Sequence, residues 1–278
     1  MPGIPLFIDC DTGIDDALAL AYLLADPTVN IVGIGAVSGN TSATRGALNT
    51  LALLAAAGRF DIPVALGDTD FWNHAYSGGS PHVHGADGVG GTGLEPVGLS
   101  LDSRSATTLL AELAREYPGQ LRVLALGPLT NMARFVTEHP AEVLLIERVG
   151  VMGGAFDVLG NVSEAAEANI HNDPEGAAVA CAGEWPMTFV PLDVTMKHLL
   201  TVPEADEIGQ LPGAIPAALH AMLGTYLGFY AEWYGFDGCA LHDPLAALLV
   251  ADAVTATEFL TPDAVGVVTE DPHRGRTV

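Results

Sequence analysis

The segment Ile4–Asp16 reads IPLFIDCDTGIDD, a short apolar run that leads directly into four carboxylates. The apolar residues Ile4–Ile8 are typical of a buried strand, and the acidic end overlaps an Ala/Leu-rich stretch with helical spacing, Asp15–Leu24. Open α/β sheets bind ligands at the carboxyl ends of their strands. The segment therefore predicts a strand-to-helix junction that carries a binding site.

The same alternation of apolar runs and helical stretches continues along the chain. Short runs rich in Val, Ile and Leu predict further strands at Asn30–Val37, Ile62–Leu66, Leu121–Leu126, Val149–Met152 and Met187–Leu192. Helical spacing predicts helices at Thr44–Ala57, Ala106–Glu116, Thr130–Glu138, Pro174–Cys181, Ile215–Trp233 and Asp243–Val250, and a late strand is expected at Ala264–Thr269. This pattern indicates an α/β fold, with a mainly parallel central sheet and helices on both of its faces.

One long segment breaks this rhythm. Gly67–Asp102 is rich in Gly, His and Asp, has little periodicity, and is longer than an ordinary connection. We interpret it as an active-site loop. Within it, His82 and His84 could either line a pocket or support the loop.

The composition narrows the class of protein. The chain has 278 residues, 49% of them hydrophobic, with no linker-like shift in composition, so we expect residues 1–278 to form one domain. A net charge of −24 would repel nucleic-acid polymers and anionic membranes. The three cysteines, Cys10, Cys181 and Cys239, form no metal motif or disulfide framework, and no apolar run has transmembrane length. We expect a cytoplasmic protein that does not bind a membrane.

The acidic motif at the end of the first strand predicts a cation. Asp9, Asp11, Asp15 and Asp16 crowd around one strand end and would repel each other unless a cation or shared protons offset their charge. Because the donors are oxygens, the candidates are calcium and magnesium, and the spacing does not decide between them. In the alternative interpretation, these carboxylates complement a helix dipole or lie in a solvated turn.

Two later polar clusters could belong to the same site. Asp243 follows His242 at a loop-to-helix junction, although it could simply be a helix cap. The segment Gly160–Asn169 carries amides and acids, which suit the donors and acceptors of sugar hydroxyls, although alone it is an ordinary polar loop.

Taken together, the segments resemble the inosine-uridine-preferring nucleoside hydrolase family from Ile4 to Val278. The motifs that carry the resemblance, in chain order, are Asp9–Asp16, Gly39-Asn40, His84–Gly88, Gly127–Asn131, Met152–Ala155, Glu167–Ile170, Asp173–Glu175 and His242–Pro244. Thr12 stands where proline is commonest in the family. The resemblance also implies a further strand and helix beyond Val278, and a homodimer or homotetramer.

The resemblance implies roles for individual residues. Calcium would be bound by Asp11, Asp16, Asp243 and the backbone carbonyl of Leu126. The residues implied to surround the ribose are Asp15, Asn40, Asn161, Glu167 and Asn169. Asp9 would have a supporting role.

The expected reaction is hydrolysis of the N-glycosidic bond of ribonucleosides, of the inosine/uridine type, to ribose and a free purine or pyrimidine base. This reaction builds positive charge on the sugar, which an acidic pocket favours. Our hypothesis is that calcium lowers the pKa of a bound water and that Asp11 accepts its proton. His242 would be the leaving-group acid. Tyr226 and Tyr230, four residues apart, and His82 could contact the base, although the tyrosines could equally be core residues.

Two other classes of protein share parts of this pattern. A phosphatase of the haloacid dehalogenase type also begins with a strand followed by an Asp-x-Asp pair. That chemistry requires Thr or Val two positions after the second Asp, where this chain has Gly13. It also requires a downstream active-site lysine, and Lys197 is the only lysine in the sequence. A non-catalytic, metal-dependent nucleoside or ribose binding protein is the second, and the presence of both Asp11 and His242 argues against it.

Overall fold

The computed structural model describes residues 3–256 and 264–278. The strands are β1 Ile4–Cys10, β2 Val29–Ala36, β3 Val64–Leu66, β4 Asp102–Ser105, β5 Leu121–Ala125, β6 Ile146–Met152, β7 Met187–Val190, β8 Leu199–Thr201 and β9 Gly238–Ala240. The helices are α1 Ile14–Ala25, α2 Ala43–Ala56, α3 Pro81–His84, α4 Ala106–Glu116, α5 Thr130–Glu138, α6 Pro140–Val143, α7 Ala168–Asn172, α8 Pro174–Cys181, α9 Leu192–Thr195, α10 Val202–Gln210, α11 Ala214–Tyr234 and α12 His242–Val250.

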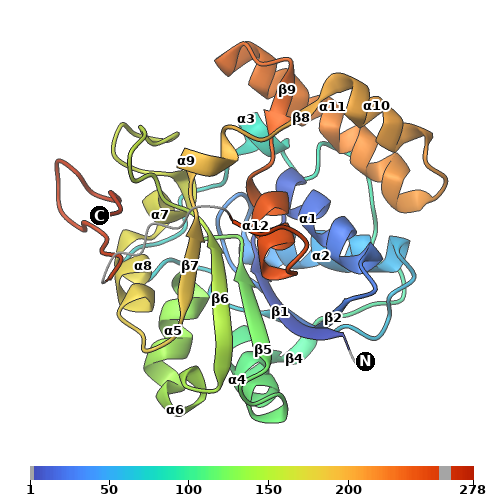
Figure 1. Cartoon of the computed structure of the whole chain (residues 1–278). Coiled ribbons are helices and arrows are strands. Elements are labelled where there is room, and N and C mark those ends of the chain that lie inside the picture. The colour runs from blue at the N-terminus through green and yellow to red at the C-terminus, as the bar shows by residue number, and fades with distance from the viewer. Residues whose placement is uncertain (1–2, 257–263) are drawn as a thin grey trace.

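Seven strands form one sheet in the order β4-β3-β2-β1-β5-β6-β7, and each neighbouring pair is parallel (Figure 1). The chain builds outward from β1 to β4 and then returns to place β5 on the other side of β1. The strand order therefore reverses between β1 and β5, which is where such sheets bind ligands, outside the carboxyl ends of the strands. The residues that follow β1 and β5 are therefore expected to form the binding site.

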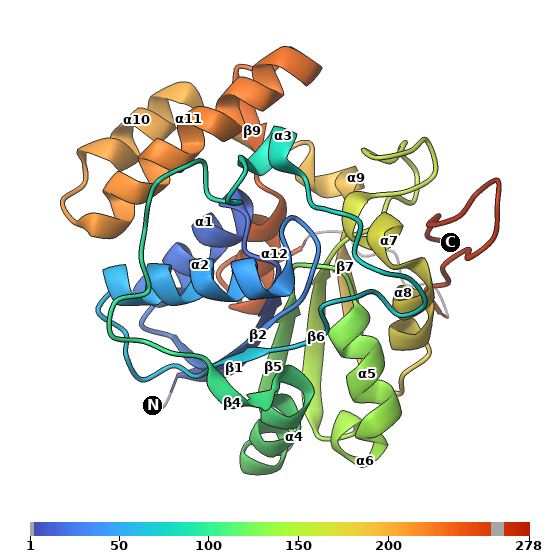
Figure 2. The ribbon, with the colours of Figure 1, turned by 180° about the vertical axis from the view of Figure 1, so that it is seen from behind.

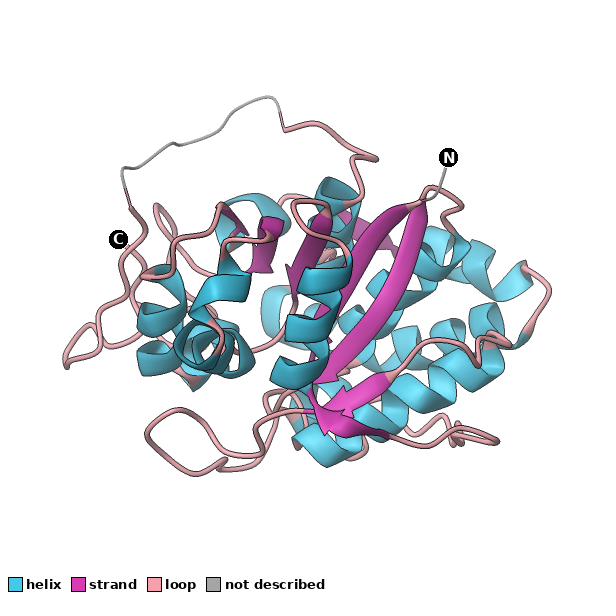
Figure 3. Cartoon of the chain, turned by 90° about the horizontal axis from the view of Figure 1, so that it is seen from below, coloured by secondary structure: helices cyan, strands magenta, loops and turns pink. Residues whose placement is uncertain are grey.

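Helices cover both faces of the sheet, as Figures 2 and 3 show. Successive side chains of a strand point to opposite faces, so Leu6 and Ile8 of β1 pack with α1, α2 and α12, while Phe7 packs with α4 and α5. Each face thus has its own apolar core. The predicted fold class, a parallel sheet between two helical layers, is confirmed.

A smaller unit lies beyond the carboxyl edge of the sheet. Helices α10 and α11 pack against each other, and the antiparallel pair of β8 and β9 leads into α12 (Figure 1). Helix α11 also contacts α1 and α3, so it stands over the acidic strand end. Within the described ranges, the structure has no helix with both the length and the apolar character needed to cross a membrane.

Most of the expected elements are present, with ends that differ by a few residues. The late strand expected at Ala264–Thr269 is wrong, because the structure has only one isolated bridge there, between Val267 and Thr277. Gly67–Asp102 is indeed largely irregular, and it contains only the one-turn helix α3. The sequence did not predict the edge strand β4 of the main sheet, nor the short elements α6, α7, α9, α10, β8 and β9.

The C-terminal segment packs onto the loop that follows β6. Thr277 is buried, and its hydroxyl accepts a hydrogen bond from Ala155 N at 3.0 Å and donates to Ala155 O at 2.9 Å. Arg274 forms an ion pair with Glu175 of α8, with a second contact from Nη2 to Oε2 of 2.7 Å. These contacts fasten the last described residues beside the turn at Gly154.

One buried carboxylate joins the long loop to the helices. Asp173 is completely buried, and its Oδ2 accepts from Trp72 N at 3.0 Å and from the hydroxyl of Thr130 at 2.6 Å. Its Oδ1 accepts from Gly176 N at 2.9 Å, at the start of α8. Asp173 therefore holds residues near Trp72 against α5 and α8.

Replacing Asp173 with Ala is expected to lower the free energy of unfolding by about 3–5 kcal/mol, because three donors, two of them in buried hydrogen bonds, lose their carboxyl acceptor. Thermal denaturation checks this. Asp70→Ala is the matched control, because Asp70 lies in the same loop and accepts one exposed hydrogen bond, from Tyr76 N. Equal, small shifts of the melting temperature in both variants would contradict the role given to Asp173.

Candidate active site

Asp11 lies where β1 ends and is held by the segment that follows β2. Its Oδ2 accepts a hydrogen bond of 2.5 Å from Asn40 N, and the Asn40 side-chain amide lies 3.4 Å from both Asp11 Oδ1 and Asp16 Oδ2. Gly39 permits this approach, since a Cβ atom there would stand 1.9 Å from Asp11 Oδ2. Adjacent parallel strands thus place Asp11, Asp16 and Asn40 together.

Asp15 and Asp16 occupy the first turn of α1. Asp16 Oδ2 accepts from Gly13 N at 2.7 Å, which caps the helix, and Asp15 Oδ2 accepts from the hydroxyl of Tyr226 at 3.2 Å. His84 Nδ1 is 3.8 Å from Asp15 Oδ1. That nitrogen accepts a hydrogen bond from Ile14 N at 3.1 Å and so carries no proton, and burial lowers the pKa of His84. The contact is therefore not an ion pair.

Three buried carboxylates converge from two distant parts of the chain. Asp15, Asp16 and Asp243 each offer an oxygen atom, and these atoms all lie within 4.8 Å of one another. Asp15 Oδ1 and Asp16 Oδ1 have no hydrogen-bond partner among the described residues. Two of the three residues, Asp16 and Asp243, are predicted metal ligands, whereas Asp15 stands in this group in place of the predicted Asp11.

The electrostatics of these carboxylates are unfavourable without a counter-charge. Burial raises the pKa of Asp16 to about 7, and the charge of Asp15 adds to this effect. Burial, followed by the charge of Asp16, raises the pKa of Asp11 well above its ordinary value. Burial, followed by the charges of Asp15 and Asp16, also raises the pKa of Asp243 well above its ordinary value. A cation at this position would favour the ionised form of all of them.

The residues present fit a hard divalent cation. All of the side-chain donors are oxygens, which calcium and magnesium prefer. A backbone donor is also near, because Gly127 follows Leu126 at the end of β5 and a Cβ atom on Gly127 would lie 3.1 Å from Asp11 Oδ1. Leu126 O accepts one hydrogen bond, of 2.6 Å, from the side chain of Asn169 and retains a second lone pair.

The predicted ribose-binding residues of the third cluster form one connected unit. Glu167 is buried and accepts hydrogen bonds from Gly154 N at 3.1 Å, Asn169 N at 2.9 Å and Ile170 N at 3.2 Å. Burial raises the pKa of Glu167 to about 7. Asn161 is exposed, and its side-chain oxygen accepts from Ala168 N at 2.9 Å. Asn169 reaches the site through Leu126 O, so it connects this unit with the acidic strand end.

His242 lies in a buried row of polar side chains. Its Nε2 is 2.7 Å from the hydroxyl of Tyr230, and its Nδ1 is 2.7 Å from the hydroxyl of Thr195. Burial lowers the pKa of His242 to about 4, so the ring is neutral at neutral pH. The rings of Tyr226 and Tyr230 are in edge contact, with centroids 5.0 Å apart. Both tyrosines are buried, and their hydroxyls face functional candidates.

His82 lies apart from these residues. It is exposed, and its ring packs 5.9 Å from Phe229 and 6.4 Å from Trp233 on the outer side of α11. The histidine that reaches the site is His84, whose ring stacks on Tyr226 at 5.7 Å. The structure thus groups His84, and not His82, with the residues of the acidic strand end.

Two residues that hold candidate site side chains in place, Asn131 and Thr195, were not predicted from the sequence. Asn131 donates a 2.7 Å hydrogen bond to Asp9 Oδ1 and so fixes the carboxylate that precedes Asp11. Asn131 does belong to the quoted Gly127–Asn131 motif, which was a usable signal. Thr195 had no signal, because it lies 47 positions from its partner His242 in an unremarkable helix.

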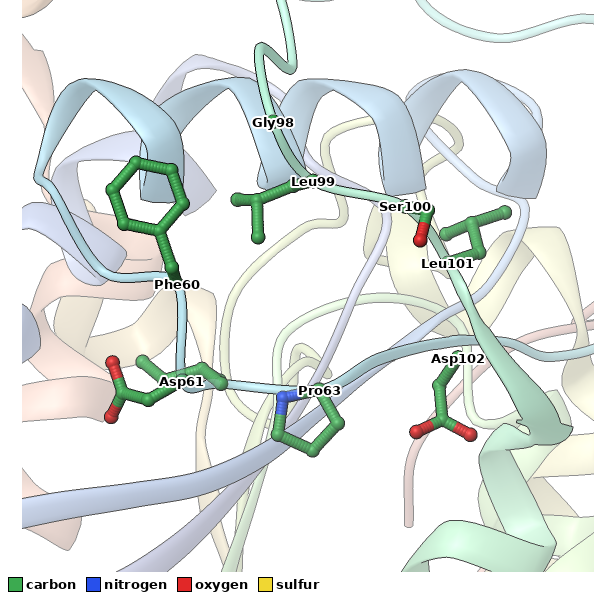
Figure 4. A pocket seen from close by; sticks show the side chains of 9 residues that line it. Phe60, Asp61, Pro63, Gly98, Leu99, Ser100, Leu101 and Asp102 are labelled. Carbon is green, nitrogen blue, oxygen red and sulfur yellow. The ribbon is translucent and has the colours of Figure 1, made fainter.

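The cavities of the structure do not all mark this site. A cavity of about 450 Å³ lies before β3 and β4 and is lined by residues including Phe60, Pro63 and Leu99 (Figure 4). It is at the amino ends of these strands and contains none of the clustered carboxylates. A smaller cavity of about 270 Å³ includes Asn40 and Tyr76 among its lining residues and therefore borders the site.

Comparison with known proteins gives consistent results. The family model described as inosine-uridine preferring nucleoside hydrolase matches residues 6–278. Uridine nucleosidase 1 of Arabidopsis thaliana is 35% identical over 249 residues, covering 88% of this chain and 73% of that protein. A solved plant nucleoside hydrolase superposes with a TM-score of 0.93 at 32% identity, covering 99% and 86% of the two chains. A solved purine-preferring ribonucleoside hydrolase from Gardnerella vaginalis superposes with a TM-score of 0.93 at 31% identity. The match covers 98% of this chain and 87% of that chain.

Proposed function

Because this chain belongs to the inosine-uridine preferring nucleoside hydrolase family and is a hydrolase of ribonucleosides, we propose that the cluster at the end of β1 is its calcium-dependent active site. The observation that carries the proposal is the group of buried carboxylates from α1 and α12, two of which have an oxygen without a hydrogen-bond partner in the described part of the chain. Residues 1–278 would act as one nucleoside hydrolase domain.

The residues assigned to hold Ca2+ are Asp11, Asp16, Asp243 and the carbonyl of Leu126. Asp16 Oδ1 is buried and unpartnered among the described residues, and Asp11 reaches the same place through the shared amide of Asn40. When bound, Ca2+ supplies a positive charge that lowers the pKa of water and orients hydroxyl groups. It also offsets the mutual repulsion of the carboxylates.

Asp11 is assigned as the general base. Its hydrogen bond from Asn40 N fixes the direction of the carboxylate, so that it can accept a proton from the attacking water. As that water adds to the anomeric carbon, the bond to the base breaks and ribose is released. The surrounding negative charge favours the positive charge that develops on the sugar in this step.

The ribose is assigned to residues on both sides of the acidic cluster. Asp15 and Asn40 come from the ends of β1 and β2, and Glu167 and Asn169 come from the segment that follows β6. Asn161 stands at the exposed end of that segment and would contact the sugar at its rim. Holding the ribose from two sides fixes the orientation of the glycosidic bond for attack.

His242 is assigned to the leaving base. Because both ring nitrogens are hydrogen-bonded, to Tyr230 and to Thr195, His242 would act as the leaving-group acid by way of these hydroxyls. Tyr226 and Tyr230 lie between His242 and Asp15 and are placed to contact the base as well. His82, in contrast, would act only at the outer rim, through Phe229 and Trp233.

The proposal also covers the cellular compartment and the oligomeric state of the enzyme. Cys10, Cys181 and Cys239 are free thiols, which fits a reducing compartment, and we place the enzyme in the cytoplasm. As the family resemblance implies, we propose a homodimer or homotetramer. Size-exclusion chromatography with light scattering tests this, and a monomeric mass at working concentration would contradict it.

The experiment that tests the function measures release of reducing sugar from uridine, cytidine, inosine and adenosine. We expect turnover with Ca2+ that falls by at least about 100-fold after chelation and returns when Ca2+ is added back, since one preorganised electrostatic group contributes on that scale. The names of the relatives span uridine and purine substrates, so the panel includes both classes. Metal binding without turnover on any nucleoside would support the binding-protein alternative.

A further inference from the structure

The carboxylate of Glu167 is held between two parts of the chain. Asn169 N and Ile170 N, which donate to it at 2.9 Å and 3.2 Å, belong to α7. Gly154 N, which donates at 3.1 Å, belongs to the turn after β6. A hydrogen bond weakens steeply when its length or angle changes. The direction of this carboxylate therefore depends on the separation of α7 and the turn, and not on α7 alone.

The loop that joins the turn to α7 is poorly suited to fix this separation. Ala155 and Ala166 are buried, but most of residues 157–165 between them are exposed. Asp193 of α9 binds the first residues of the loop, and a backbone N–H of α7 donates to Asn161. These two contacts fasten the loop to different helices. Exposed loops with few buried contacts are the parts of a fold that open most readily, so a further contact is needed.

Thr277 of the C-terminal segment contacts the turn. Its side chain is buried, and its hydroxyl accepts from Ala155 N at 3.0 Å and donates to Ala155 O at 2.9 Å. The side chain also packs against the neighbouring glycine, because a Cβ atom on Gly154 would lie 3.2 Å from both Cγ2 and Oγ1 of Thr277. Thr277 thus fixes the turn at the residue whose N–H donates to Glu167.

Gly275, two residues earlier, contacts the other part. A Cβ atom on Gly275 would lie 2.7 Å from Ala166 Cβ and 3.4 Å from the Cα atom of His171. Ala166 directly precedes Glu167, and His171 belongs to α7. Figures 1 and 2 show this end of the chain beside α7 and α8. One short stretch of the C-terminal segment therefore touches both the turn and the start of α7.

We propose that Gly275 and Thr277 are positioning residues that hold the Glu167 carboxylate in place for the ribose, by fixing the separation of the turn and α7. The inference rests on the proposed role of Glu167 in ribose binding and adds the C-terminal segment to it. No covalent step is involved. A ligand binds more tightly to a group that is already ordered, so loosening these contacts should weaken ribose binding.

The first test compares two substitutions of Thr277 in the Ca2+-loaded enzyme. Thr277→Val keeps the shape of the side chain and removes the hydroxyl, whereas Thr277→Ser keeps the hydroxyl. Thr277→Val should raise both KM for the best nucleoside and the inhibition constant of ribose about 10-fold, as loss of a hydrogen bond to a charged group does. Thr277→Ser should resemble the wild type. A merely structural defect would instead lower kcat with the folded fraction and leave KM unchanged.

A double variant tests whether Thr277 acts through Glu167. Glu167→Ala should itself raise KM. Adding Thr277→Val to it should change KM by less than about twofold, because the group that Thr277 positions is already gone. Multiplicative effects in the double variant would overturn the proposal, as would an unchanged KM in Thr277→Val. Failure of the proposed function looks different, because KM would then be unchanged in Glu167→Ala alone.

Gly275→Ala tests the contact from its other side and does not depend on the folding of a Thr277 variant. Its Cβ atom would meet Ala166 in a backbone conformation with a φ of +83°, so it should separate the segment from α7 and raise KM in the same way. Gly119→Ala is the matched control, because Gly119 has a φ of +69° and its Cβ atom would meet nothing within 4 Å in the described part of the chain. Thr107→Val, which removes a buried hydroxyl on α4, is the control for Thr277→Val.

Both controls should leave KM and kcat unchanged. Calorimetric titration should give the wild-type Ca2+ affinity in every variant, because the carboxylates assigned to the ion follow β1 or belong to α1 and α12. A wild-type KM in folded Gly275→Ala would overturn the proposal. So would a loss of Ca2+ affinity that parallels the rise in KM, since the substitutions would then disturb the whole site and not the ribose side alone.

Discussion

Asp11→Asn is expected to lower kcat by about 10³-fold or more, with the fold intact. Asparagine has the shape of aspartate and can still accept from Asn40 N, but it cannot take a proton from the attacking water. Loss of a general base costs about 10²–10⁴-fold, and Asp11 is also assigned to the metal, which adds to the effect. Single-turnover hydrolysis at saturating Ca2+ measures the chemical step directly.

Asp26→Asn is a suitable control for this experiment. Asp26 follows the other end of α1 and hydrogen-bonds to Tyr22 and Thr28, remote from the acidic cluster. It should change neither kcat nor the affinity for Ca2+. If Asp11→Asn retained the wild-type rate at saturating Ca2+, Asp11 would be removed as the base, and another carboxylate of the cluster would have to replace it.

Asp243→Asn is expected to weaken Ca2+ binding on the order of 100-fold, which corresponds to about 2.7 kcal/mol of lost stabilisation by the ion. The same change should make the metal-free protein more stable, because asparagine avoids the cost of either ionising this buried carboxyl beside Asp15 and Asp16 or protonating it. The variant should therefore melt at a higher temperature than the wild type in chelator. In excess Ca2+, its melting temperature should rise less than that of the wild type.

Calorimetric titration gives the affinity, and thermal denaturation with and without Ca2+ gives the two stabilities. Asp252→Asn is the matched control, because Asp252 follows the same helix at its other end and pairs at the surface with Arg122. A variant that binds Ca2+ as tightly as the wild type would show that Asp243 is not a ligand. A metal-free variant less stable than the wild type would contradict the account of repulsion.

Local sequence patterns predicted the central sheet well because its strands are buried on both faces. Runs such as Ile4–Ile8 are continuously apolar for that reason, and the helices between the strands have clear spacing. Shorter elements gave weaker signals. β8 and β9 have three residues each, and α10 is rich in exposed acidic side chains, so neither periodicity nor composition marked them. The segment Ala264–Thr269 gave the opposite error. Its mostly apolar sequence predicted a strand, but the structure has only a single bridge there, from Val267 to Thr277.

The residues of the candidate site were likewise predictable only in part. Asp15 and Asp16 share one motif with Asp11, and the strand order brings Asn40 beside them, so these positions followed from the motifs and the parallel sheet. Contacts between residues far apart in the sequence, such as Tyr226 and Asp15, had no local sequence pattern that could predict them. The choice between His82 and His84 depends on half a turn of α3, which decides which ring faces Ile14 and which faces solvent.

The order in which the chain is synthesised gives one more consequence of the cluster shared by α1 and α12. Asp15 and Asp16 leave the ribosome early, but Asp243 follows only after all seven strands of the sheet have been made, roughly tens of seconds later at ordinary rates of translation. Until then, a nascent chain would carry an acidic strand end without its third carboxylate. The enzyme would thus gain its metal, and its activity, only after α12 has been synthesised.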